Sequence, residues 1–99
     1  MVRTKGTVMK VLAMSTNSGD PTAYLADEGA AVEDLTRRGV VEWVLVKADW
    51  SGAVLLLDVP DVETARTTVE ALPIAAHGLT RFDLTPVLDP PAPGGSPTA

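Results

Sequence analysis

Cysteine is absent from this 99-residue chain, and histidine occurs once. Without thiols the chain has no disulfide framework, thiol nucleophile or zinc–thiolate site, and this absence fits a reducing compartment. The sequence also lacks a histidine–carboxylate cluster at metal-ligand spacing, a glycine-rich phosphate loop and a Gly-x-Ser-x-Gly elbow. We therefore expect a cytoplasmic protein that uses no metal and no cofactor.

Aromatic and basic residues are scarce. The chain has two tryptophans, one tyrosine and one phenylalanine, and 8 basic against 13 acidic residues leave a formal net charge of -5. Nucleic-acid-binding surfaces combine clustered basic residues with aromatic platforms, so we expect no nucleic-acid partner. No apolar run reaches the length of a membrane span, and the first residues do not resemble a signal peptide, so we expect no membrane association.

Apolar periodicity and turn residues predict six elements in one domain. A strand over residues 8–14 is followed by a helix that begins at Asp20-Pro21 and ends at Gly39. The apolar runs 40–47 and 53–59 are separated by a five-residue loop, which predicts an antiparallel hairpin. Asp61 then caps a second amphipathic helix, Leu72-Pro73 ends it, and a short apolar loop leads to a last strand over about residues 79–87.

This order of elements predicts a ferredoxin-like βαββαβ fold of the α+β class, in which a four-stranded antiparallel sheet carries two helices on one face. The domain spans residues 8–87, between a flexible N-terminus of residues 1–7 and a disordered, Pro/Gly-rich tail of residues 88–99. Both faces of the central hairpin are apolar, whereas the helices cover one face. We therefore expect a homodimer through the sheet face, which would form a dimeric α/β barrel.

A series of short motifs follows this predicted order. They are the opening strand 9–14, Asp27-Glu28, Leu35-Thr36-Arg37-Arg38-Gly39, Trp43, Asp58-Val59-Pro60-Asp61-Val62-Glu63 and Leu72-Pro73-Ile74. In their order and spacing, which cover roughly residues 9–87, they resemble the muconolactone isomerase-like family of the dimeric α/β-barrel superfamily.

The resemblance implies a function. Family members include isomerases that move a proton next to a lactone carbonyl, and their relatives include cyclases and cofactor-independent oxygenases that act on aromatic or polyketide-like compounds. For this chain the resemblance implies a small organic substrate in a pocket between sheet and helices, near the dimer seam. The alanine- and proline-rich composition also suggests a GC-rich bacterial source, which would fit a role in secondary metabolism.

Two residues are candidates for acid/base catalysis. His77 precedes Gly78 at the entrance to the last strand, where its side chain either points into a cavity and transfers protons or faces solvent. Glu28 lies one helical turn from Leu25 and Val32 and can face the sheet, although an acidic residue near a helix N-terminus is most often solvated. The resemblance makes Glu28 the second candidate after His77.

Five further residues are candidates for substrate binding. Tyr24 either donates a hydrogen bond to a carbonyl or packs beside the core. Arg81 either binds a substrate carboxylate or stabilises an enolate, or it forms a solvated pair with Asp83. Asp83 could also orient His77. Trp43 is either core or a pocket wall, and Trp50, in the hairpin loop, is either a dimer contact or a lid over a flat substrate. 

The sequence thus predicts a cofactor-free isomerase or cyclase that acts by proton transfer on a small, largely apolar carbonyl, lactone or polyketide-like compound. Two alternatives remain open. One is a non-catalytic binding or accessory dimer module, and the other is a cofactor-independent monooxygenase of the same fold.

Overall fold

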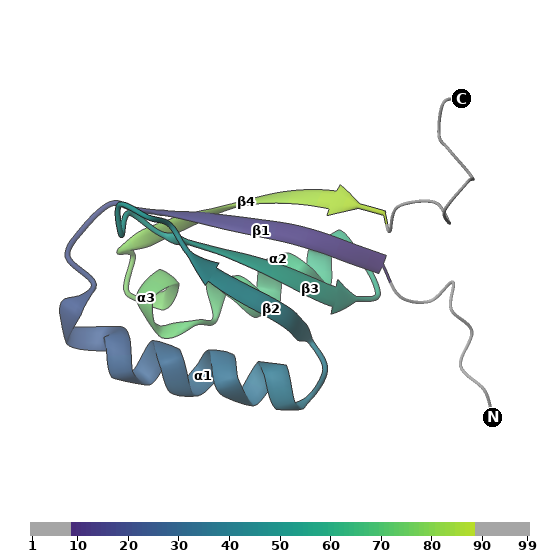
Figure 1. Ribbon diagram of the computed structural model, residues 1–99, viewed down its shortest axis with the longest axis horizontal. Coiled ribbons are helices and arrows are strands. Elements are labelled where there is room, and N and C mark those ends of the chain that lie inside the picture. Colours follow the sequence, from purple (N-terminus) through teal and green to yellow (C-terminus); the bar gives the residue numbers. More distant parts are fainter. Residues whose placement is uncertain (1–8, 89–99) are drawn as a thin grey trace.

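The computed structural model describes residues 9–88, which form one sheet with helices packed against it (Figure 1). The predicted flexible N-terminus (1–7) and the predicted tail, apart from Leu88, lie outside the described residues. In chain order the elements are β1 (Met9–Asn17), the 3₁₀ turn η2 (Thr22–Tyr24), α1 (Leu25–Arg37), β2 (Val41–Val46), β3 (Ala53–Val59), α2 (Val62–Glu70), α3 (Pro73–Ala76) and β4 (Thr80–Val87).

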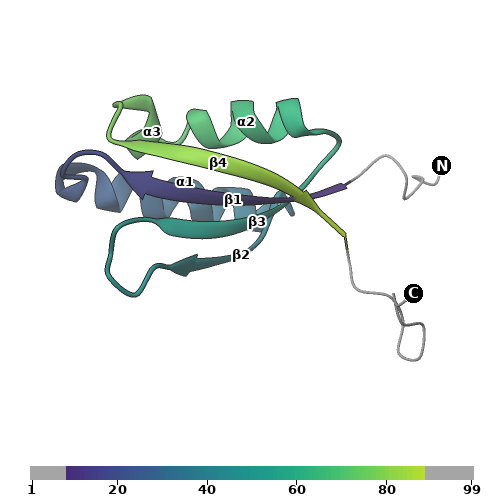
Figure 2. The same cartoon turned by 90° about the horizontal axis from the view of Figure 1, so that it is seen from above.

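The sheet has the ferredoxin-like strand order. Its four strands lie in the order β2-β3-β1-β4, and every neighbouring pair is antiparallel. Figures 1 and 2 together show α1, α2 and α3 on the same side of this sheet. The predicted α+β class and ferredoxin-like βαββαβ order are therefore confirmed, with α3 as an additional short helix.

The core lies between the sheet and its helices. Alternate residues of the central strands point toward the helices, because successive side chains of a strand face opposite sides. Val11 of β1, Leu57 of β3 and Val69 of α2 are each fully buried. Burying a side chain of this kind stabilises the fold by about 1.5–3 kcal/mol relative to leaving it exposed, so these contacts hold the two layers together.

Asp61 starts α2 as the sequence predicted. Its backbone is extended, with φ -161° and ψ 172°, and its carboxylate accepts a hydrogen bond from the Thr64 amide at 2.7 Å. This bond satisfies one of the amides that a helix leaves unpaired at its first turn. Hydrogen bonds from the Thr64 side chain and amide lower the pKa of Asp61.

The start of the first helix differs from the prediction. Asp20 accepts hydrogen bonds from the Thr22 amide at 3.0 Å and the Thr22 hydroxyl at 2.5 Å, and this local bonding starts η2 rather than α1. The α-helix itself begins at Leu25. Its predicted end is confirmed, because Gly39 follows with φ 79°, a conformation that glycine adopts without strain.

The predicted apolar loop after Leu72 is also wrong. Pro73 occupies the first turn of α3, where its fixed φ favours a helix and its missing amide hydrogen costs nothing. The hairpin loop is one residue longer than predicted, because β2 ends at Val46 and β3 begins at Ala53. The Lys47 amide still donates to the Gly52 carbonyl at 2.9 Å across this loop.

The sheet face opposite the helices, here called the open face, is largely apolar. Its side chains include Leu12, Met14, Trp43, Leu45, Val54 and Leu56, and Met14, Trp43 and Leu45 are exposed. At one end of this face, Lys10 Nζ bridges Glu42 at 2.5 Å and Asp58 at 3.4 Å. Within residues 9–88, no helix is long and apolar enough to cross a membrane.

Candidate functional site

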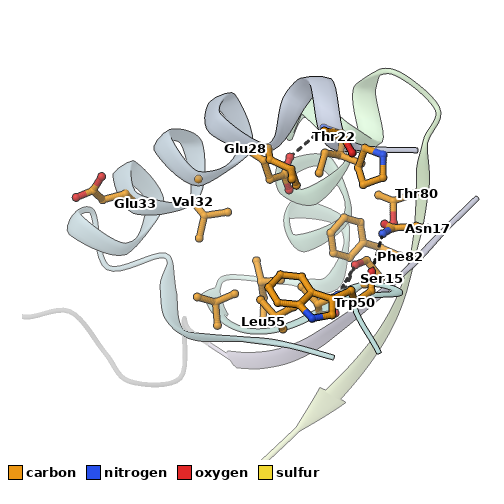
Figure 3. Close-up of a pocket in the computed structure, with 18 of the residues that line it drawn as sticks. Ser15, Asn17, Thr22, Glu28, Val32, Glu33, Trp50, Leu55, Thr80 and Phe82 are labelled. Carbon is orange, nitrogen blue, oxygen red and sulfur yellow. Dashed lines mark hydrogen bonds between the residues drawn. The ribbon is translucent and has the colours of Figure 1, made fainter. Parts of the chain in front are cut away.

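A pocket of about 650 Å³ opens between α1 and the sheet (Figure 3). This volume falls within the range of roughly 300–1,000 Å³ that is usual for small-molecule sites. Apolar side chains from every layer line it, among them Leu25, Val32, Val44, Leu55, Ile74 and Phe82. The site is therefore built by the fold as a whole and not by one loop.

The pocket exists because α1 packs closely on the core near its C-terminal end only. Leu35 is buried there, whereas Leu25 at the opposite end of the helix is 53% exposed. Between them Gly29 has no side chain, and a Cβ added at this position would meet no atom within 4 Å. Val44 and Val46 of β2 line the space that remains, and both are exposed.

Glu28 is the carboxyl group of the inner pocket wall. Its side chain projects from α1 toward the pocket in Figure 3, and Oε1 accepts a hydrogen bond from the Ile74 amide of α3 at 2.9 Å. Burial raises the pKa of Glu28, and the Ile74 hydrogen bond opposes this shift without cancelling it. A half-buried carboxyl of raised pKa can exchange a proton closer to neutral pH than an ordinary glutamate.

The lining of the pocket has an acidic character. Two of the residues that line it are acidic, namely Glu28 and Glu33, and Glu33 is exposed. No basic side chain lines the pocket in the part of the chain that the structure describes. A ligand carboxylate would thus meet two like charges without a compensating cation.

Trp50 lines the pocket from the hairpin loop, while its side chain remains largely in solvent. It is 77% exposed, and its φ of 63° places a bulky residue in the left-handed region, which costs about 1–2 kcal/mol. The loop approaches β1 closely at Gly52. A Cβ added at this position would lie 1.9 Å from the Ser15 carbonyl oxygen, so only glycine fits there. The loop thus presents the indole to the pocket in Figure 3.

His77 and Tyr24 lie together outside the residues that line this pocket. Their rings stack with a centroid distance of 3.9 Å, and His77 Nδ1 lies 2.8 Å from the Pro73 carbonyl oxygen. His77 is exposed, which is the solvent-facing one of its two predicted placements. The stack joins η2 to the end of α3. The catalytic role of His77 and the substrate-binding role of Tyr24 stay predictions.

Trp43, Arg81 and Asp83 belong to the open face and not to the pocket. Trp43 is paired with Leu56, and Arg81 and Asp83 are paired with Thr16 and Met14 of β1. Arg81 and Asp83 are both exposed. In the chain as described, the sheet separates these three side chains from Glu28, so the predicted substrate-binding residues fall into two groups on opposite faces.

Glu42 and Lys10 form the charged cluster of the open face. Hydrogen bonding to Glu42 is the largest of the effects that raise the pKa of Lys10. Glu42 lies at an irregularity in the pairing of β2 with β3, between Val41 and Trp43. Residues 9–88 contain no group of three or more histidine, cysteine or carboxylate residues that could hold a metal ion.

The chain matches no protein-family model and no curated protein. The candidate function therefore rests on the geometry of the pocket and on the resemblance described above. Sequence reasoning identified Glu28 and Trp50 as site residues but missed Asn17, Gly29, Thr80 and Phe82, which also line the pocket. Alternation along the last strand was a usable signal for Thr80 and Phe82, because it places them on the same face as the buried core.

Proposed function

We propose that this protein binds a small, largely apolar carbonyl compound in the pocket and catalyses a cofactor-free isomerisation or cyclisation by proton transfer. The observation that carries the proposal is the half-buried carboxyl group of Glu28 in a pocket with apolar walls. The proposal agrees with the resemblance to muconolactone isomerase-like proteins, whose members move a proton next to a lactone carbonyl.

In the proposed reaction the Glu28 carboxylate removes a proton from the carbon next to the ligand's carbonyl, and the electron pair moves onto the carbonyl oxygen to give an enolate. Return of the proton from Glu28 to another carbon of the conjugated system completes an isomerisation. In a cyclisation, the enolate carbon attacks a second carbonyl carbon of the same ligand and forms the new carbon–carbon bond. The π electron pair of that carbonyl moves onto its oxygen, which takes back the proton from Glu28. The raised pKa of Glu28 supports this role, because a carboxylate with a raised pKa is a stronger base than the carboxylate of an ordinary glutamate.

The acidic lining favours an uncharged ligand. Glu28 and Glu33 are the carboxylates of the pocket, and Arg81, the predicted partner of a substrate carboxylate, lies on the other face of the sheet. A neutral ketone or lactone avoids repulsion by these carboxylates. The proposal therefore excludes a free carboxylate near Glu28 and retains the carbonyl group.

The test uses 2-tetralone, an apolar bicyclic ketone with exchangeable protons next to its carbonyl. The protein in D₂O should accelerate the exchange of these protons for deuterium, which NMR follows directly. Glu28→Gln keeps an oxygen that can accept from the Ile74 amide, so it should stay folded. We expect it to lose about 10²–10⁴-fold of the protein-catalysed rate, the usual contribution of one acid/base group.

Glu33→Gln is the matched control, because it removes the second lining carboxylate from an exposed position. We expect this variant to retain the wild-type exchange rate. Exchange no faster with protein than in buffer, or equal in wild type and Glu28→Gln, contradicts the assignment of Glu28. His77→Ala in the same assay tests the other candidate, and we expect wild-type exchange from it.

A non-catalytic binding or accessory module is the second candidate function. The hydrogen bond from the Ile74 amide to Glu28 favours it, because this bond already gives Glu28 a structural task in joining α1 to α3. Binding of 2-tetralone in the pocket without any acceleration of exchange is the outcome expected of such a module. The exchange assay therefore separates the two functions.

We further propose that two copies of the chain associate through the open face. The support is its exposed apolar side chains, among them Met14, Trp43 and Leu45, which a second sheet would remove from water. Leu45→Glu places a charge in this face at a position that tolerates solvent in the monomer. Sedimentation equilibrium should find a dimer for the wild type and a monomer for Leu45→Glu. The control Thr67→Glu, which places the same charge on the surface of α2, should remain a dimer. A stable Leu45→Glu dimer contradicts association through the open face.

A further inference from the structure

We propose that Thr80 and Asn17 form the subsite for the uncharged oxygen of the pocket's ligand, with the Thr80 hydroxyl as hydrogen-bond donor. This inference rests on the proposed function, since it concerns the carbonyl group of the same ligand. It adds a specificity-determining pair that lies on β1 and β4, opposite the helix that carries Glu28.

The hydroxyl groups of the pocket single out Thr80. Four lining residues carry a hydroxyl, namely Ser15, Thr22, Thr36 and Thr80. Ser15 Oγ accepts from the Ala53 amide at 2.8 Å, Thr22 Oγ1 donates to Asp20 at 2.5 Å, and Thr36 Oγ1 donates to the Val32 carbonyl at 2.8 Å. Thr80 Oγ1 is buried without a partner, and it is the one such side-chain atom found within residues 9–88.

An unpaired buried hydroxyl is costly. Leaving one without a partner destabilises the folded protein, and most buried polar atoms are therefore hydrogen-bonded. Thr80 lines the pocket, and rotation about its χ1 to another staggered position reorients the hydroxyl without movement of the backbone. A carbonyl oxygen in the pocket can thus supply the missing acceptor.

Asn17 lies directly beside Thr80. The two residues are cross-strand partners in the register of β1 and β4, and both line the pocket. Asn17 Nδ2 donates to the Trp50 carbonyl at 3.5 Å, which is beyond the usual range of about 2.7–3.2 Å for such a bond. Its amide group is therefore weakly engaged and can turn toward a ligand oxygen.

The subsite gives the pocket a direction. In Figure 3, Asn17 and Thr80 lie together near Ser15 and Phe82, whereas Val32 and Glu33 lie farther along α1 at the other side of the view. Asn17 and Thr80 carry no charge, so they suit a carbonyl or hydroxyl oxygen better than a carboxylate. The ligand would place its oxygen at this uncharged pair and its apolar body along α1 and β2.

The test compares 2-tetralone with tetralin, the hydrocarbon of nearly the same shape. Dissociation constants for both compounds are measured by NMR titration of the wild type and of Thr80→Val, which replaces the hydroxyl by a methyl group. The ratio of the two constants reports on the oxygen and cancels changes in the apolar walls. We expect Thr80→Val to lower the preference for the ketone by about 2- to 12-fold, the worth of one neutral hydrogen bond.

Two variants control the comparison. Thr80→Ser keeps the hydroxyl and should retain the ketone preference, and Thr85→Val makes the same substitution on the open face of β4 and should leave both constants unchanged. A ketone preference that is equal in wild type and Thr80→Val overturns the subsite while leaving the pocket and the role of Glu28 intact. Failure of both compounds to bind the wild type overturns the proposed function and the subsite with it.

Discussion

Gly29→Ala should make the protein more stable, because Gly29 has a helical backbone and open space beside it. A Cβ at this position meets no atom within 4 Å, so the new methyl group causes no clash. Glycine inside a helix is less favourable than alanine by about 0.5–1 kcal/mol. For a domain of this size that gain corresponds to a rise in melting temperature of about 2–8 °C.

Urea denaturation and thermal melting of Gly29→Ala test this value, and both should show a stabilised protein with an unchanged urea m-value. A larger side chain extends the test to the pocket, since Gly29→Leu should fill the space that Gly29 leaves open and weaken the binding of 2-tetralone. If Gly29→Ala is less stable than the wild type, the space beneath α1 is occupied by other atoms, and the reasoning that places a pocket there is refuted.

Substitutions at three further positions test other parts of the structure. Gly52→Ala should lower the free energy of unfolding by about 1–3 kcal/mol or more, because the new Cβ would lie 1.9 Å from the Ser15 carbonyl oxygen. Urea denaturation measures this loss. Wild-type stability of the variant would contradict the close approach of the hairpin loop to β1. Asp61→Ala should lose stability at neutral pH, and Asp61→Asn should lose less, because its amide oxygen can still accept the hydrogen bond from the Thr64 amide. The difference in stability between Asp61→Ala and the wild type should shrink as the pH falls through the lowered pKa of Asp61, since protonation removes the charge of the cap; a pH-independent difference contradicts the assignment. Burial raises the pKa of Glu28, so its contribution to stability is fully present below its pKa in the unfolded chain and is lost as the pH rises through the higher folded value. Glu28→Gln should therefore become more stable relative to the wild type over that rise. A constant difference in urea titrations contradicts the burial of this carboxyl group.

The fold could be predicted from the sequence because its signals are local. Asp61 and Pro60 mark the start of α2, Gly39 marks the end of α1, and the two apolar runs around residues 48–52 predict the hairpin. The errors occurred where short-range bonding decides the geometry. Asp20 bonds to Thr22 instead of starting α1, and Pro73 starts a one-turn helix that is too short to show a period.

The candidate site was predictable only in part. Glu28 was placed toward the sheet by helical spacing from Leu25 and Val32, and it lines the pocket. Which end of α1 packs on the core depends on tertiary contacts, and so does the space beneath Gly29. The placements of His77 beside Tyr24 and of Arg81 on the open face also follow from the three-dimensional arrangement, which spacing along the chain does not specify.

The binding site of 2-tetralone on the ¹⁵N-labelled protein is the most direct test of the central claim, which assigns ligand binding to the pocket. A titration followed by amide chemical shifts should perturb Glu28, Gly29, Ile74 and Phe82, which surround the pocket from three elements. Shifts confined to the open face, at residues such as Leu12, Met14 and Leu56, or no saturable shifts at all, would contradict the account.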